Sequence, residues 1–365
     1  MLTDEQRALQ EAVRSLLTRH ATSAAVRAAV AEPRGYDEKL WDLLCGQIGV
    51  AGLSIPTRYG GAGATLTETA LVLEELGRTL APAPLLGSAV LAGRALLATQ
   101  NDEACDRLLP GIADGTRIAA LAWTDPAGEW EAPALSARAA RRDPAGTRDR
   151  SGTTDPGAWR LDGEAHYVLD GDAADVLVAV AQAGSETHLY EVDRDATSRT
   201  ATPAMDLTRR LATVRFDATP AWRLGPVDLA ALRDVAVAAL AAEQVGAAAR
   251  ALELTVAYAR TRIQFGQPIG AFQALKHRMA DMYVLVESAR SAAYAAAADP
   301  TGQAAVAKVY CSEALHHVTA EMIQLHGGIA ITWEHDAHLY FKRAHGTAHL
   351  FGDPQRYLTR LAAML

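Results

Sequence analysis

The stretch RTRIQFGQPIGAFQ, residues 260–273, interrupts a long run of helix-forming sequence. Alanine-rich segments with apolar residues at three- and four-residue spacing precede and follow it, which predicts a long helix on each side. Two glycines and a proline in its middle predict a turn. A plain turn between helices does not need Arg262, Gln264 and Phe265 just ahead of the break. These three side chains are therefore candidates for binding something.

The same helical periodicity continues to the end of the chain. Short connections between long helices are typical of an antiparallel four-helix bundle. Glycines near the C-terminus suggest that the last helix is broken. The predicted helices cover about 226–262, 270–298, 301–326 and 335–363, with the break near Gly346 and Gly352.

The preceding two thirds of the chain have two different compositions. Residues 1–115 show helical periodicity, and SIPTRYGGAGATLTE (54–68) is a loop that leads into a capped helix. Between 116 and 222, runs of five to eight residues alternate between apolar and polar and are separated by Gly, Asp and Pro. That pattern predicts an antiparallel β domain. The predicted fold class is α+β: helical domain 1–115, β domain 116–222 and helical bundle 223–365.

Composition excludes several classes of protein. Half of the 365 residues are hydrophobic and 21% are charged, as in globular proteins. The net charge of −8 argues against nucleic acid or an anionic membrane as the main partner. We expect no membrane span and no signal peptide. Three widely spaced cysteines fit a reducing cytoplasm, and no motif predicts a metal site.

A second interruption strengthens the case for a ligand. IQLHGGIAITWEHD (323–336) ends a helix with a glycine pair that follows Gln324 and His326. Paired glycines let a ligand approach the backbone, which suits a pyrophosphate. Arginine offers a forked donor to phosphate, and Phe265 a flat wall for a planar ring. The simpler alternative is a turn with an exposed arginine and a core phenylalanine.

Several long segments, in order, resemble the acyl-CoA dehydrogenase family: IPTRYGGAGATLTETALVLEELGR, LAWTDPAG, RIQFGQPIGAFQALKHRMADM and IQLHGGIAITWEHDAHLYFKRA. The resemblance covers nearly the whole chain. It implies a helical domain, a β-barrel and a helical bundle. It also implies α,β-desaturation of an acyl thioester with FAD, and electron-transfer flavoprotein or a similar acceptor.

The resemblance also implies which residues bind the cofactor. In the family, the two glycine-containing signatures bind the ADP half of a flavin that is held by the neighbouring subunit. Thr124 would lie beside this chain's own flavin ring. The implied cofactor-binding residues are Arg262, Gln264, Phe265, Gln273, Gln324, Gly327, Gly328 and Thr124.

The family's catalytic glutamate is absent from both of its usual positions. The position in the C-terminal loop is Phe351, and the position 26 residues before Arg262 is Ala236. Neither side chain can accept a proton from the substrate's α carbon. The expected catalytic set of this chain is therefore none, with Asp353 and Glu243 as weak candidates for a displaced base.

Three functions remain open at this point. The first is a non-catalytic subunit of an α2β2 acyl-CoA dehydrogenase, similar to actinobacterial steroid-degrading complexes, paired with a homologous subunit that carries the glutamate. The second is a self-sufficient homo-oligomer, such as a homotetramer, acting on an acyl-CoA or acyl-carrier-protein substrate with a displaced base. The third is a flavin-free scaffold or acyl-thioester binding protein.

Overall fold

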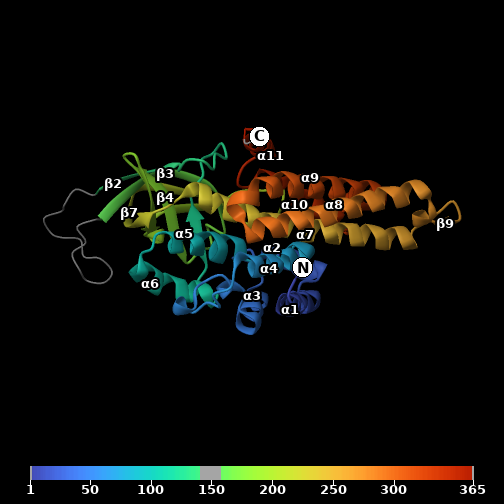
Figure 1. Ribbon diagram of the computed structural model, residues 1–365, viewed down its shortest axis with the longest axis horizontal. Helices are drawn as coiled ribbons and strands as arrows, with labels where there is room; N and C mark the ends of the chain where they lie inside the picture. Colours follow the sequence, from blue (N-terminus) through green and yellow to red (C-terminus); the bar gives the residue numbers. More distant parts are fainter. Residues whose placement is uncertain (1, 140–157, 364–365) are drawn as a thin grey trace.

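The computed structural model describes residues 2–139 and 158–363 (Figure 1). Its first part is helical, as predicted. A π-helical segment, Leu85–Ala92, precedes α5 and is buried along its whole length. The helices are α1 (Asp4–His20), α2 (Ser23–Ala31), α3 (Glu38–Leu43), α4 (Leu66–Thr79), α5 (Gly93–Ala98) and α6 (Asp102–Ala113).

The loop before α4 shows how sequence sets local structure. The Thr65 side chain accepts a hydrogen bond from Thr67 N–H at 3.1 Å, and the Glu68 carboxylate accepts one from Thr65 N–H at 2.9 Å. This reciprocal arrangement satisfies backbone donors that the first helical turn leaves free. Gly61 is required in the loop because a Cβ there would lie 2.0 Å from the Ile55 carbonyl oxygen. The predicted loop and capped helix are confirmed.

The middle part is a seven-stranded sheet. Its pairings run β4–β2–β3–β7–β5 and return to β4, which makes a closed ring of five strands, with β1 and β6 attached. The pairs β1–β4 and β2–β4 are parallel, so the prediction of a purely antiparallel domain is wrong. The strands are β1 (Ala119–Ala122), β2 (Leu135–Ala139), β3 (Ala158–Leu169), β4 (Val176–Ala183), β5 (Glu186–Val192), β6 (Ser198–Ala201) and β7 (Leu211–Pro226).

Long helices form the last part and extend away from the sheet (Figure 1). The predicted break of the last helix is confirmed at Gly352, which lies between α10 and α11, whereas Gly346 lies inside α10. The helices are α7 (Leu229–Thr261), α8 (Gln273–Ala298), α9 (Pro300–His326), α10 (Ala337–His349) and α11 (Pro354–Ala362), and the short strands β8 (Ile263–Gln264) and β9 (Gln267–Pro268) join α7 to α8.

The central helix α7 is apolar enough to resemble a membrane span. Its length and composition alone would let it cross a bilayer, contrary to the expectation that no segment reaches that length. In the fold, 89% of its apolar window is buried against other elements. The apolar character of α7 is explained by its place at the centre of the bundle.

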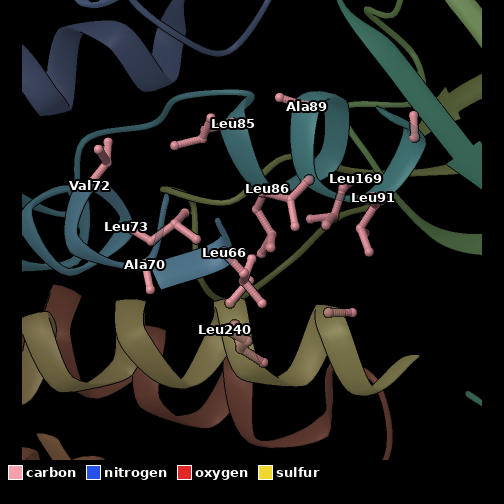
Figure 2. Close-up of a cluster of buried hydrophobic side chains, with 14 of the residues drawn as sticks. Leu66, Ala70, Val72, Leu73, Leu85, Leu86, Ala89, Leu91, Leu169 and Leu240 are labelled. Atoms are coloured by element: carbon pink, nitrogen blue, oxygen red, sulfur yellow. The ribbon is translucent and has the colours of Figure 1, made fainter. Parts of the chain in front are cut away.

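The N-terminal part packs directly on the bundle. Figure 2 shows apolar side chains of α4 and the segment Leu85–Ala92 facing Leu240 of α7, with Leu169 at the end of β3 beside them. Glycines permit this contact, since a Cβ on Gly77 would lie 2.0 Å from the carbonyl oxygen of Glu243. Helix α4 and α7 therefore touch backbone to backbone, which fixes the relative position of the two helical parts.

Candidate cofactor and active site

The turn that opened the sequence analysis is a tight hairpin at the far end of the bundle (Figure 1). Its two turn residues, Phe265 and Gly266, both have positive φ, 50° and 77°. Such a turn favours Asn or Gly, and a phenylalanine there is strained. The Phe265 side chain is 91% exposed, and its ring lies 6.1 Å from that of Phe272, edge to face. The hairpin thus holds an aromatic ring out in solvent.

Polar side chains surround the hairpin. Arg262 is exposed, and within residues 2–139 and 158–363 its guanidinium has no ion-pair partner. The Gln264 side chain donates to Ile263 O at 2.9 Å, and Gln273 Nε2 lies 2.9 Å from His277 Nε2. A free arginine and accessible amides could reach a ligand without breaking a structural ion pair.

The glycine pair lies at the same end of the bundle. The His326 ring, just before the pair, stacks on the Tyr258 ring with centroids 4.4 Å apart, and Tyr258 is one helical turn before Arg262. Gly327 has φ 67°, and a Cβ on Gly327 or Gly328 would meet nothing within 4 Å. The fold therefore brings the two signatures of the sequence together, and it leaves space over the glycine backbone.

Gln324 is exposed on the last turn of α9, close to this glycine pair. Six residues of the two signatures are exposed and offer the side-chain or backbone donors that phosphate and ribose require: Arg262, Gln264, Gln273, Gln324, Gly327 and Gly328. The ADP half of FAD fits these residues, and their role in binding it stays a prediction. No carboxylate within the described ranges forms an ion pair with Arg262 that a ligand would have to displace.

Aromatic side chains surround the C-terminal loop position at which the family has its catalytic base. Phe351 is fully buried with φ 63°, and its ring lies 5.0 Å from Trp130. Trp130 in turn contacts Trp123, with centroids 5.3 Å apart. The Tyr357 hydroxyl donates to Phe351 O at 2.6 Å. An aromatic cluster of these four side chains, the aromatic plug, occupies the position of a base.

A buried lysine fixes the loop that carries Phe351. Lys308 of α9 is 1% exposed, and its ammonium donates to Thr347 O at 3.1 Å and to Leu350 O at 2.7 Å. These carbonyls lie at the C-terminal end of α10, where a cation is favourable. Burial nevertheless lowers the pKa of Lys308 to about 7. The loop is thus held by side chains of the core.

The second base position is equally closed. Ala236 is fully buried on α7, among the apolar residues of the main core. In the same core, the Cβ of Leu169 lies 2.9 Å from where a Cβ on Gly87 would be. The end of β3 therefore packs onto the segment Leu85–Ala92 (Figure 2). Apolar side chains therefore enclose Ala236 on this side of α7.

The hydroxyl of Thr124 is also hydrogen-bonded within the chain. Thr124 is fully buried, and its hydroxyl donates to Glu129 O at 3.0 Å. The neighbouring strand is linked to it by an isolated bridge to His166. The hydroxyl proton is used within its own loop, so this geometry offers none to a flavin ring. With Leu169 and the aromatic plug in place, the residues do not fit an isoalloxazine ring held by this chain alone.

Glu243, the first weak candidate for a base, is buried in an ion-pair network. Its carboxylate contacts the guanidinium groups of Arg209 and Arg343. Arg343 also donates to Asp206 at 2.6 Å. Burial opposes ionisation of Glu243, but the charges of Arg209 and Arg343 outweigh it and hold its pKa below the usual range. A carboxylate held ionised by two arginines is a poor proton acceptor.

Asp353, the second weak candidate, caps a helix. Its Oδ1 accepts from Gln355 N–H at 2.8 Å at the start of α11, and its Oδ2 lies 3.4 Å from His349 Nδ1. Asp353 is at the rim of a cleft of about 530 Å³ between sheet and bundle. The cleft is lined by Gly128, Trp130, Tyr167, Leu211, Leu350 and Arg356, among others. Arg356, one of the lining residues, is paired with Glu129.

Sequence reasoning missed two features of this region. The buried pairing of Arg343 with Glu243 joins residues 100 positions apart, and nothing in the local pattern marks either charge as buried. Lys308 was missed as well, although it lies in an apolar helical pattern that would have predicted burial at its position. An apolar neighbourhood around a lysine is the available signal for such a residue.

Comparison with known proteins agrees with this architecture. Residues 3–116 match the family model of the acyl-CoA dehydrogenase N-terminal domain, and residues 234–365 match that of the C-terminal domain. The chain is 44% identical over 363 residues to the acyl-CoA dehydrogenase IpdE2 of Mycolicibacterium smegmatis, covering 99% of each. It is 46% identical to IpdE2 of Mycobacterium tuberculosis, covering 98% of this chain and 96% of that one.

Solved structures give the same result. The Tcur3481–Tcur3483 steroid ACAD has a TM-score of 0.87 at 32% identity, covering 99% of this chain and 97% of the other. The ChsE4–ChsE5 complex of Mycobacterium tuberculosis has a TM-score of 0.86 at 27% identity, covering 100% and 97%. Together with the matched sequence signatures, these likenesses show that the chain belongs to the acyl-CoA dehydrogenase family.

Proposed function

We propose that this chain is the non-catalytic subunit of an α2β2 acyl-CoA dehydrogenase and completes the FAD site of its partner. The observation that carries the proposal is a contrast within one chain. The aromatic plug fills the base position with Phe351 and Trp130. At the other end, Arg262, Phe265 and the glycine pair are open to a ligand.

The partner would be a homologous subunit that carries the missing glutamate. Two structural relatives are themselves two-chain proteins, Tcur3481–Tcur3483 and ChsE4–ChsE5, which supports this assembly. The substrate class is an acyl-CoA thioester, and the steroid ACAD among the relatives favours a steroid-derived one. When bound, the flavin accepts a hydride from the substrate's β carbon. An electron-transfer flavoprotein or similar acceptor, and a cytoplasmic location, complete the proposal.

Each cofactor-binding residue that this chain would contribute has a defined role in that site. The Arg262 guanidinium would donate to phosphate oxygens as a forked, permanent cation. Gly327 and Gly328, with no side chain, would let the pyrophosphate approach the backbone. Phe265 would supply an apolar wall, and Gln264, Gln273 and Gln324 would donate or accept at the sugar and base. None of these residues moves a proton, because the base would belong to the partner.

Flavin content tests the proposal directly. We would record visible absorbance of the purified chain alone, and after co-expression with the homologous acyl-CoA dehydrogenase encoded nearest to it. A flavin band only in the co-purified complex is expected. Arg262→Ala should then lower FAD retention at least about tenfold, the value of one charge-assisted contact. Arg260→Ala is the matched control, since Arg260 is also exposed and lies two residues away. Equal flavin content in all three complexes would contradict the proposal.

The alternative of a self-sufficient enzyme has one observation in its favour. The cleft of about 530 Å³ lies beside Asp353, which is the only described carboxylate lining it. A full complement of flavin in the chain alone, with turnover abolished by Asp353→Asn, would establish that alternative. Absence of flavin with every homologous partner would instead favour the flavin-free scaffold.

A further inference from the structure

Three imidazoles lie within residues 326–338, the segment that contains the glycine pair. His326 immediately precedes Gly327, its ring is stacked on Tyr258, and it lies 4.6 Å from the ring of His335. His338 follows at the start of α10, with its ring 4.9 Å from that of Trp333. Residues 326–338 thus place three imidazoles in the segment proposed to bind the nucleotide.

Hydrogen bonding shows that the fold accommodates these imidazoles as neutral rings. His326 Nδ1 is 2.8 Å from Met322 O, so it is the protonated nitrogen of that ring. His335 Nδ1 accepts from Ala337 N–H at 3.1 Å, which excludes a proton on Nδ1. Both nitrogens of His338 are buried without a hydrogen-bond partner. A second proton on His335 would break the bond that supports the first turn of α10.

The surrounding charges do not favour protonation either. From α2, Arg27 donates to Asp336 at 2.8 Å, and Ser23 donates to the same carboxylate oxygen at 2.6 Å. From α10, the Lys342 ammonium lies 4.5 Å from the Trp333 ring centroid. The other nearby carboxylate, Glu334, is exposed in the loop, and α7 contributes only the Tyr258 hydroxyl. The segment therefore has two cations close by, one carboxylate that is already paired and one that is exposed.

Burial, the largest cause, lowers the pKa of both His326 and His338. The positive charges of Lys342 and Arg27 lower that of His338 further. A histidine with a folded pKa below its unfolded value of about 6.5 stabilises the fold above that pH. This stabilisation is lost as the pH falls through the folded pKa.

The same segment carries exposed apolar side chains. Ile329, Ile331 and Trp333 are 44%, 74% and 65% exposed. Large exposed apolar residues next to a ligand segment are typical of contact with another protein. Because these residues lie between His326 and His338, any rearrangement forced by charging the imidazoles would move this apolar surface together with the glycine pair.

We propose that His326, His335 and His338 form a proton-sensitive latch, which holds the homologous subunit and its FAD at neutral pH and releases them in mild acid. This inference rests on the proposed function, because it regulates the same nucleotide-binding segment. The latch acts on the geometry of the glycine pair and of the apolar surface beside it, and it takes no part in proton transfer to substrate.

The test follows flavin release from the co-purified complex as a function of pH. Freed FAD fluoresces more strongly than bound flavin, so fluorescence from about pH 8 to about pH 5.5 reports release across the range in which histidine titrates. His338→Leu removes a titrating ring that has no hydrogen bond to lose. His335→Gln is the second variant, since its amide oxygen can still accept from Ala337 N–H. Each variant should shift the release midpoint downward by about half a pH unit or more.

His317→Gln is the matched control, because His317 is an exposed histidine on α9. It should leave the midpoint unchanged. Midpoints of both latch variants equal to that of the parent complex would overturn the latch, while flavin retention at pH 8 that still depends on Arg262 would leave the proposed function standing. A complex without flavin at every pH would instead overturn the proposed function. If His338→Leu does not fold, the shift in His335→Gln decides.

Discussion

At the scale of the residue, Phe265 shows a conflict between stability and binding. A non-glycine residue with φ of 50° at an exposed turn costs free energy, and the ring has only an edge contact with Phe272 to offset it. Such strain persists where the side chain has another task. The aromatic ring is therefore better explained by a partner's ligand than by the stability of this chain.

Replacing Phe265 tests that explanation. Phe265→Gly should raise the free energy of unfolding of the isolated chain by about 0.5–1 kcal/mol, because glycine adopts positive φ without strain. The same change should weaken FAD retention by the complex. Urea unfolding of the chain and flavin absorbance of the complex are the two measurements. A loss of stability together with unchanged flavin would show that Phe265 is a structural residue.

Lys308 predicts a dependence of stability on pH. Its pKa is about 7 in the fold and 10.5 in the unfolded chain, so the unfolded chain binds the extra proton between these values. The free energy of unfolding should therefore gain up to about 1.4 kcal/mol per pH unit as pH rises through that window, and this gain is absent below pH 7.

Lys308→Met removes the titrating group and keeps an unbranched apolar chain. Urea unfolding at pH 7.5 and 9 should show a smaller rise in stability for this variant than for the parent. The difference between the two proteins isolates Lys308, since the buried thiols and tyrosines are the same in both. Parallel profiles would mean that the lysine stays charged in the fold.

At the scale of the element, the loop between α10 and α11 explains why one substitution cannot restore activity. Phe351 is enclosed by Trp130 and fixed by Tyr357, and the segment Leu85–Ala92 and β3 fill the neighbouring space. A carboxylate at position 351 would lie against the Trp130 ring, because residue 351 does not line the cleft of about 530 Å³. It would also replace a buried aromatic ring with a charge that has no partner.

Phe351→Glu should therefore give no acyl-CoA dehydrogenase turnover by the isolated chain. The variant should also lose about 3–5 kcal/mol of stability, the usual cost of removing a buried aromatic ring. Dye reduction with an acyl-CoA substrate and urea unfolding measure the two effects. Turnover in this variant would show that an acyl pocket is present after all.

At the scale of the whole molecule, the two ends of the helical bundle differ in structure. Near the sheet, the aromatic plug fills the position of the base, and Glu243 is paired with Arg209 and Arg343. The end at the hairpin is open and carries a free arginine and exposed apolar residues. This contrast is the basis of the proposal that the chain completes a site in a partner subunit.

The proposed division of roles between the two subunits predicts how much FAD the complex contains. The complex should contain one FAD for each pair of unlike chains, measured by flavin absorbance against protein mass.

Asp353→Asn and Glu243→Gln in this chain should leave turnover per folded complex within about twofold, because the base would lie in the partner. Glu243→Gln should still destabilise by about 3–5 kcal/mol, since it breaks a buried ion pair. A collapse of turnover in either variant would place the base on this chain.

The sequence by itself determined the order of helical, β and helical parts, the capped start of α4 and the residues of both glycine-containing signatures. These features depend on periodicity, on turn residues and on hydrogen bonds between near neighbours, which local sequence specifies. The position of Phe351 in place of a base was also evident from sequence, whereas the packing of Trp130 against it was not.

Only the tertiary structure decided the parallel pairings of β4 and the burial of Arg343 with Glu243 and Asp206. Arg343 is 100 and 137 positions from those two carboxylates. A buried charge is stable only with a partner, and a partner so distant in sequence is brought near only by the packing of sheet against bundle. The tertiary structure likewise decided the stacking of His326 on Tyr258 of α7, which no local pattern indicated.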